Sequence, residues 1–150
     1  MSNTTIYNAV VTKAGELFPS KQRMHNPYEL SDNPELILRD SWGLKVGSAE
    51  FIEIEYCNLS IGREYTFILT RQFATIGSAR DAFDSVTISM LEDQQLFLNN
   101  IYSSSELGVP DDIVQIVITN IGGIDFAVAD QKKYLFLEIT FRITLSTPAI

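Results

Sequence analysis

The residues of this chain that could carry out chemistry are few and form no recognisable catalytic set. His25 is the only histidine, and a hydrolytic triad would need it beside a nucleophile such as Cys57 or a serine. The sequence has no Gly-x-Ser-x-Gly elbow and no cysteine-protease signature around Cys57. As the only cysteine, Cys57 also excludes an internal disulfide and a cysteine-rich zinc site. We therefore expect no enzymatic activity.

Two other patterns could bind a ligand, and each has a simpler interpretation. Glu53 and Glu55 follow Glu50 closely, but they alternate along a predicted strand, which is typical of an acidic surface rather than a metal site. The pair Gly122-Gly123 is followed by neither a helix nor a phosphate-binding lysine, so we interpret it as a hairpin turn. The sequence therefore predicts no metal and no cofactor.

The overall charge opposes binding to nucleic acid. Nineteen acidic and eleven basic side chains give a formal net charge of −8, and the lysines and arginines are scattered along the chain. The N-terminal residues lack the basic flank and apolar core of a secretory signal, and no apolar run approaches the roughly 18 residues of a membrane helix. We expect a protein that is soluble, made in the cytoplasm, and not attached to a membrane.

The element that must organise the rest is the stretch 133–145, which has the longest period-two alternation in the chain. One face carries only apolar residues, which predicts a strand with that face in a core. The opposite face carries Tyr134, Phe136, Glu138, Thr140, Arg142 and Thr144. At about 3.3 Å per residue the strand is roughly 40 Å long, about twice the ordinary length. Such length suggests contacts beyond the domain itself.

The remaining elements follow from helical and strand periodicity. Helices are predicted at 6–18 and 81–102, the second with Ser78 as its cap, and strands at 44–56, 63–73, 113–119 and 124–128. Turns at 58–62 and 120–123 make two hairpins. The strand 113–119 is dense in isoleucine and valine and is predicted to be central. A strand at 86–89 is the alternative to the second helix.

This order of elements predicts the fold class. Helix, two strands, helix and three strands indicate a single α+β domain over 1–150, with a mostly antiparallel sheet and two helices packed on one face. Residues 19–43 lack periodicity and contain two Asn-Pro pairs, so we expect an irregular but ordered arm. Trp42, at the end of this arm, is expected to be a packing anchor more than a binding residue.

Several short motifs resemble the tail terminator (tail completion) proteins of tailed bacteriophages. They lie at 18–21, 26–30, 33–43, 46–49 and 63–71, and Asp93-Gln94 and the closing strand keep the same order. The resemblance spans nearly the whole chain. It implies an α+β subunit of a six-fold ring on the last ring of the tail tube, in the tail or neck of the virion. It also implies that the partners are further copies, the tail tube protein and the head-completion (connector) proteins.

The resemblance and the extended segments together predict which residues contact other subunits or partners. Candidate subunit or partner contacts are Asn26, Pro27, Tyr28, Trp42, Phe136, Glu138 and Arg142. DNA would pass the ring without specific binding, and an acidic inner wall would repel it. Our hypothesis for that wall is a set drawn from Glu50, Glu53, Glu55, Asp125, Asp130 and Glu138.

Two alternatives remain open from the sequence. The first is another neck, connector or tail-tube subunit, which shares ring assembly. The second, from a different class, is a small α+β domain that binds a ligand under a lid formed by the segment around His25. Ring size and the type of tail also stay open.

Overall fold

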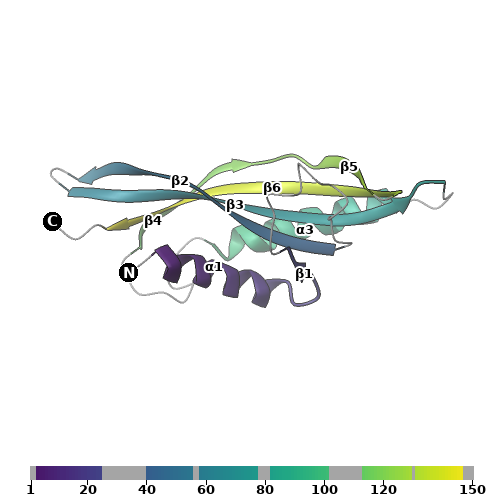
Figure 1. Cartoon of the computed structure of the whole chain (residues 1–150), viewed down its shortest axis with the longest axis horizontal. Coiled ribbons are helices and arrows are strands. Elements are labelled where there is room, and N and C mark those ends of the chain that lie inside the picture. Colours follow the sequence, from purple (N-terminus) through teal and green to yellow (C-terminus); the bar gives the residue numbers. More distant parts are fainter. Residues whose placement is uncertain are drawn as a thin grey trace.

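The structure is a computed structural model that describes residues 3–24, 40–55, 58–77, 82–101, 113–129 and 131–146. Within these residues the chain forms one long, mostly antiparallel sheet with two helices on the same side (Figure 1). The elements are α1 (Asn3–Leu17), β1 (Gln22–Arg23), β2 (Asp40–Glu55), β3 (Asn58–Thr75), α3 (Phe83–Asn99), β4 (Ile113–Ile121), β5 (Asp125–Ala129) and β6 (Lys132–Ser146). The predicted α+β class is confirmed.

Strand β6 lies in the interior of the sheet and is paired on both sides. Strand β3 runs antiparallel along one side, and β4 and β5 run along the other. The side chains that β6 turns toward the helices are at most 2% exposed: Leu135, Leu137, Ile139, Phe141 and Ile143. The predicted strand and its buried face are therefore confirmed.

An aromatic cluster joins the sheet to both helices. The Phe67 ring of β3 stacks on Phe97 of α3 with a centroid separation of 3.9 Å, and Trp42 and Phe18 lie 6.0 and 5.7 Å away. Helix α1 adds an apolar row at intervals of four residues, Ile6, Val10 and Ala14, all 0% exposed. Burial of these side chains is the main force that holds both helices against one face of the sheet.

The positions of β4 and β5 differ from two predictions, the hairpin turn at 120–123 and the central place of 113–119. They do not form a hairpin, because both pair antiparallel with β6, with Ile121 opposite Ile139 and Asp125 opposite Phe136. They therefore follow one another as a single interrupted strand at the rim of the sheet, and the predicted turn at 120–123 and central place of 113–119 are wrong. An isoleucine-rich strand buried on one side by helices has the same composition whether it is central or outermost.

The close approach of two backbones explains Gly122. Its N–H donates a hydrogen bond to the Glu138 carbonyl oxygen at 2.8 Å, and a Cβ on Gly122 would lie 2.8 Å from that same oxygen. Three residues lie between Ile121 and Asp125, whereas two lie between their partners on β6, so the strand bulges here. Glycine at this position serves close strand contact rather than a turn.

The predicted arm is corrected at both of its ends. Gln22–Arg23 form β1, a short strand that pairs in parallel with Ser41 and Trp42, and 40–43 belong to β2. The predicted element order therefore lacked one strand. The predicted turn at 58–62 is also wrong, because Asn58 already pairs with Glu55. Polar residues and glycine signal a turn by composition, whereas this ladder continues through them.

The second predicted helix is confirmed as α3, which excludes the alternative strand at 86–89. Its beginning differs from the prediction: Ala82 occupies the N-cap position and makes no side-chain cap hydrogen bond. Ser78, the predicted cap, lies outside the described residues. Among the residues that the structure describes, neither helix has the length and apolar character needed to cross a membrane.

Replacement of Gly122 by alanine tests the bulge. We expect Gly122→Ala to lower the free energy of unfolding by about 1–3 kcal/mol, because its Cβ would overlap the Glu138 carbonyl. Gly123→Ala is the matched control, since its Cβ would meet nothing within 4 Å. Urea unfolding of both variants measures the difference. Equal stabilities would contradict the close approach.

The buried phenol of Tyr65 should make the folded protein less stable at alkaline pH. Its side chain is 1% exposed and stacks on Phe141, and burial raises the pKa of its phenol above 10 while Arg63 opposes this in part. The unfolded chain then releases the proton at lower pH than the folded chain, so stability falls as the pH rises past about 10. Tyr65→Phe should flatten this fall in unfolding measurements between about pH 9 and 11. A wild-type slope retained by the variant would contradict the assignment.

Candidate functional site

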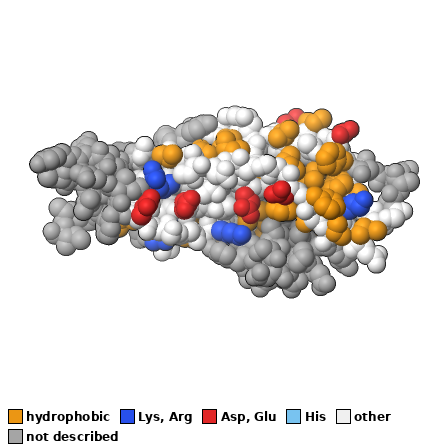
Figure 2. Space-filling view, turned by 90° about the horizontal axis from the view of Figure 1, so that it is seen from above, with side chains coloured by type: hydrophobic (Ala, Val, Ile, Leu, Met, Phe, Trp, Pro, Cys, Tyr) orange, Lys and Arg blue, Asp and Glu red, His pale blue; other side chains and the backbone are white. Residues whose placement is uncertain are grey.

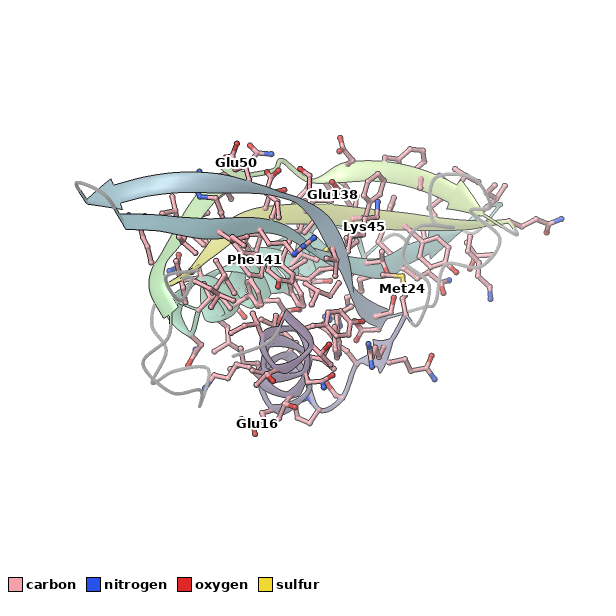
Figure 3. All side chains as sticks on the ribbon, turned by 60° about the vertical axis from the view of Figure 1, so that its left-hand side comes forward. Glu16, Met24, Lys45, Glu50, Glu138 and Phe141 are labelled. Carbon is pink, nitrogen blue, oxygen red and sulfur yellow. The ribbon has the colours of Figure 1, made fainter. Side chains whose placement is uncertain are left out.

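The face of the sheet that points away from the helices, which we call the outer face, is the candidate site. Residues directly opposite each other in a ladder point to the same face. Glu64 therefore shares the outer face with Arg142, and Asp125 shares it with Phe136. Figure 3 shows Glu50 and Glu138 on the side of the sheet away from α1. The register thus gathers predicted contact residues and predicted lumen residues on one surface.

An ion pair crosses three strands of this face. Arg142 of β6 lies 3.7 Å from the carboxylate of Glu50 on β2. Gly62 of β3 lies between the two strands, opposite Glu50, and has no side chain to obstruct the contact. Glu64 stands directly opposite Arg142 on the same face. The guanidinium therefore pairs with Glu50 across β3, although its Nε is buried without a hydrogen-bond partner among the described residues.

The rest of the outer face is mainly polar with charges of both signs, and a part of it is buried, since Ser41, Ile68, Thr70 and Tyr134 are at most 3% exposed. Thr66 and Thr140 lie opposite each other with their hydroxyls 3.3 Å apart, and Ser41 and Thr70 share a second hydroxyl contact. The register places on this face the carboxylates Glu50, Glu64, Asp125 and Glu138 and the cations Lys45, Lys132 and Arg142. Figure 2 shows acidic and basic side chains along the middle of the face and hydrophobic side chains gathered at one end. The face carries no positive surplus.

The predicted contact residues fall into three groups. Phe136, Glu138 and Arg142 share the outer face, where each is half-buried. Asn26, Pro27 and Tyr28, and the predicted lumen residue Asp130, lie outside the described residues. Glu53 and Glu55 belong to β2 near the end of its hairpin, opposite Leu59 and Asn58.

Trp42 has a different environment from the other predicted contacts. It is 3% exposed, and its ring stacks on Phe67. The guanidinium of Arg23, on β1, lies 5.7 Å from the centroid of the Trp42 ring. Arg23 in turn donates a hydrogen bond to the Tyr7 hydroxyl at 2.9 Å. The expected packing role is confirmed, and a side chain so buried offers almost no surface to a partner.

A second cluster of charges lies on the helix side of the sheet. Lys21, with a side chain only 5% exposed, forms ion pairs with Asp40 of β2 and, at 3.2 Å, with Asp93 of α3. Arg71 of β3 donates a hydrogen bond to Ser89 of the same helix. These contacts join α3 to Lys21, just before β1, and to β3. Across the described ranges, no group of three or more His, Cys, Asp or Glu side chains is arranged to hold a metal.

A hollow of about 440 Å³ lies at the start of α3 and bears on the ligand-binding alternative. It is wide open and lined by Ala82, Phe83, Asp84 and Ser85. One carboxylate and one hydroxyl from a single helical turn do not converge on a ligand from several sides, as binding sites require. The described residues that line the hollow therefore do not by themselves form a small-molecule site.

The rim strand and the helix beside it form a surface that the sequence patterns did not predict. Ile121, Phe126 and Val128 on β4–β5 and Phe83, Ile88 and Leu91 on α3 are each 43–58% exposed, and we call these six residues the apolar strip. The predicted hairpin would have placed a further strand beside Ile121. The available signal was the run 113–129 itself, in which Asp125 is the only charged residue.

Neither the protein-family models nor the curated proteins that were searched match this chain.

The ion pair on the outer face is expected to contribute little to folding. Glu50 is 70% exposed, so a double-mutant cycle with Glu50→Gln and Arg142→Gln should give a coupling below about 1 kcal/mol. Urea unfolding of the wild type, both single variants and the double variant measures it. A coupling above about 2 kcal/mol would show that Arg142 is structural and unsuitable as a probe of assembly.

Proposed function

We propose that this chain is a structural virion protein, a tail terminator whose copies form a ring that caps the tail tube and joins it to the head-completion proteins. The observation that carries the proposal is the long sheet, with strands of up to 18 residues, covered by helices on one face only. A sheet this long with a polar outer face is suited to forming the wall of an assembly. The family motifs from 18–21 to the closing strand support the same role.

In this proposal the outer face lines the channel of the ring. Glu50, Glu64 and Glu138 would then lie along the path of the DNA. A wall with as much negative as positive charge does not hold a polyphosphate, because tight non-specific binding requires lysines and arginines that displace counterions. The wall would therefore let DNA pass. Phe136 and Arg142, on the same face, are the residues proposed to reach a neighbouring subunit.

Capping of tail tubes tests the function directly. The purified chain is added to polymerising tail tube protein from the same source, and tube length and ends are measured by electron microscopy. A terminator should shorten the tubes and leave a six-fold ring at one end. Tubes of unchanged length with no ring would contradict the proposal. Polymerisation of the chain into tubes by itself would identify it instead as a tail-tube subunit.

A charge reversal at Arg142 tests the proposed contact. Arg142→Glu should prevent capping while the monomer stays folded, because it places a third carboxylate beside Glu50 and Glu64. Circular dichroism verifies the fold and the capping assay measures the loss. Glu92→Lys, an exposed charge reversal on α3, is the control and should cap normally. Normal capping by Arg142→Glu would show that Arg142 is not a contact between subunits.

Reversal of the carboxylates tests the channel wall. The triple variant Glu50→Lys, Glu64→Lys, Glu138→Lys should bind double-stranded DNA with an affinity that falls steeply with salt, whereas the wild type should not bind. Electrophoretic mobility at two salt concentrations measures this. The control carries the same charge change at exposed helix positions: Glu16→Lys, Asp84→Lys, Glu92→Lys. Equal DNA binding by both triple variants would contradict the assignment of the outer face to the channel.

A further inference from the structure

We propose that the rim formed by 113–129, together with the apolar strip, is the surface on which a second copy of this chain packs. This inference stands apart from the proposed function, because two copies that meet rim to rim form a two-fold pair rather than the contact of a ring. Two features of the surface support it independently, namely a strand edge with almost no charge and exposed apolar side chains beside it.

The first feature is the strand edge. Within the described residues, β4 and β5 pair with β6 alone, and no other described strand pairs with their second side. Natural proteins protect such edges with lysines, prolines, charges or bulges. From 113 to 129 there is no lysine and no proline, and Asp125 is the only charge. Bulges interrupt the pairing with β6 at 113–115, at 118–120 and beside Gly122, so the edge is irregular, and its low charge is the property that favours contact with another chain.

The second feature is the apolar strip. Ile121 and Phe126 stand opposite the core residues Ile139 and Leu135, so they point to the helix side of the sheet, yet they are 52 and 57% exposed. The Gln94 side chain of α3 donates a hydrogen bond to the Gly122 carbonyl, which places this flank of the helix beside the rim strand.

Aromatic contacts connect the strand part of the strip with the start of the helix. The rings of Phe83 and Phe126 both contact Phe73, with centroids 5.5 and 6.0 Å away. Leu91 precedes Gln94 by three residues and lies on the same flank of α3. Six large side chains, each about half exposed, offer roughly 500 Å² of apolar surface, a large part of the about 800 Å² that each partner buries in a standard interface.

Self-complementarity favours a second copy over an unrelated strand. The surface requires a partner strand with one apolar side and little charge, and 113–129 is itself such a strand. When two copies meet on this rim, Asp125 is the only source of like-charge repulsion. The apolar sides of both copies can then be buried together with α3 beneath them.

The experiment compares wild type with Phe126→Lys and with the double variant Ile121→Lys, Leu91→Lys by sedimentation velocity at concentrations up to about 1 mM. We expect a discrete oligomer for the wild type and at least about a tenfold weaker association for each variant, because each lysine brings a charge into the apolar contact. Leu96→Lys is the control, since Leu96 is 39% exposed on the same helix but off the strip. It should associate as the wild type does.

Unfolding midpoints verify that every variant is folded, and amide hydrogen exchange supplies a second measurement. Exchange of amides in 113–129 should slow with concentration in the wild type and not in Phe126→Lys. Association by the variants equal to that of the wild type, or a wild-type monomer at every concentration, would overturn the proposal. A wild-type dimer lost in the variants would support the rim contact and weigh against a ring, whereas tube capping decides the terminator function separately.

Discussion

The whole structure depends on the pairing of β6 along both of its sides. A strand in this position has its backbone groups satisfied by neighbours, so its alternating side chains alone decide what covers each face. Five apolar residues on one side, all nearly completely buried, require a helical layer, and α1 and α3 supply it around Phe67 and Phe97. Every other surface of the molecule is defined relative to this strand.

The outer face is the first consequence. Opposite the helices, the register brings Arg142 of β6, Glu50 of β2 and Glu64 of β3 within one small area, although they lie far apart in the sequence. The ion pair spans the sheet because Gly62 leaves the space between them open. A polar, charge-balanced face on a long sheet is compatible with a wall along which DNA moves without being held.

The rim is the second consequence, and its apolar composition has two opposing effects. An apolar strand with few charges packs well on α3, but the same composition leaves its outer edge attractive to other strands. In an isolated monomer this edge favours aggregation, whereas in an oligomer it becomes part of the interface. The balance between these outcomes depends on whether a specific partner covers Phe126 and Ile121.

The sequence by itself determined the features that depend on local periodicity. The alternation in 133–145 predicted a long, half-buried strand, and the helical spacing of apolar residues over 6–18 predicted the first helix. Both are correct because alternation and helical spacing are properties of a single segment packed against any core. The α+β class followed from the order of these segments.

Only the tertiary structure decided which strands are neighbours. Gly122-Gly123 has the composition of a turn, yet the chain continues past it along β6, because the Glu138 carbonyl accepts the Gly122 N–H at a distance that excludes a side chain. The same long-range pairing moved 113–119 from the centre to the rim and left the apolar strip exposed. Strand partners are chosen by contacts between distant segments, and no local pattern records that choice.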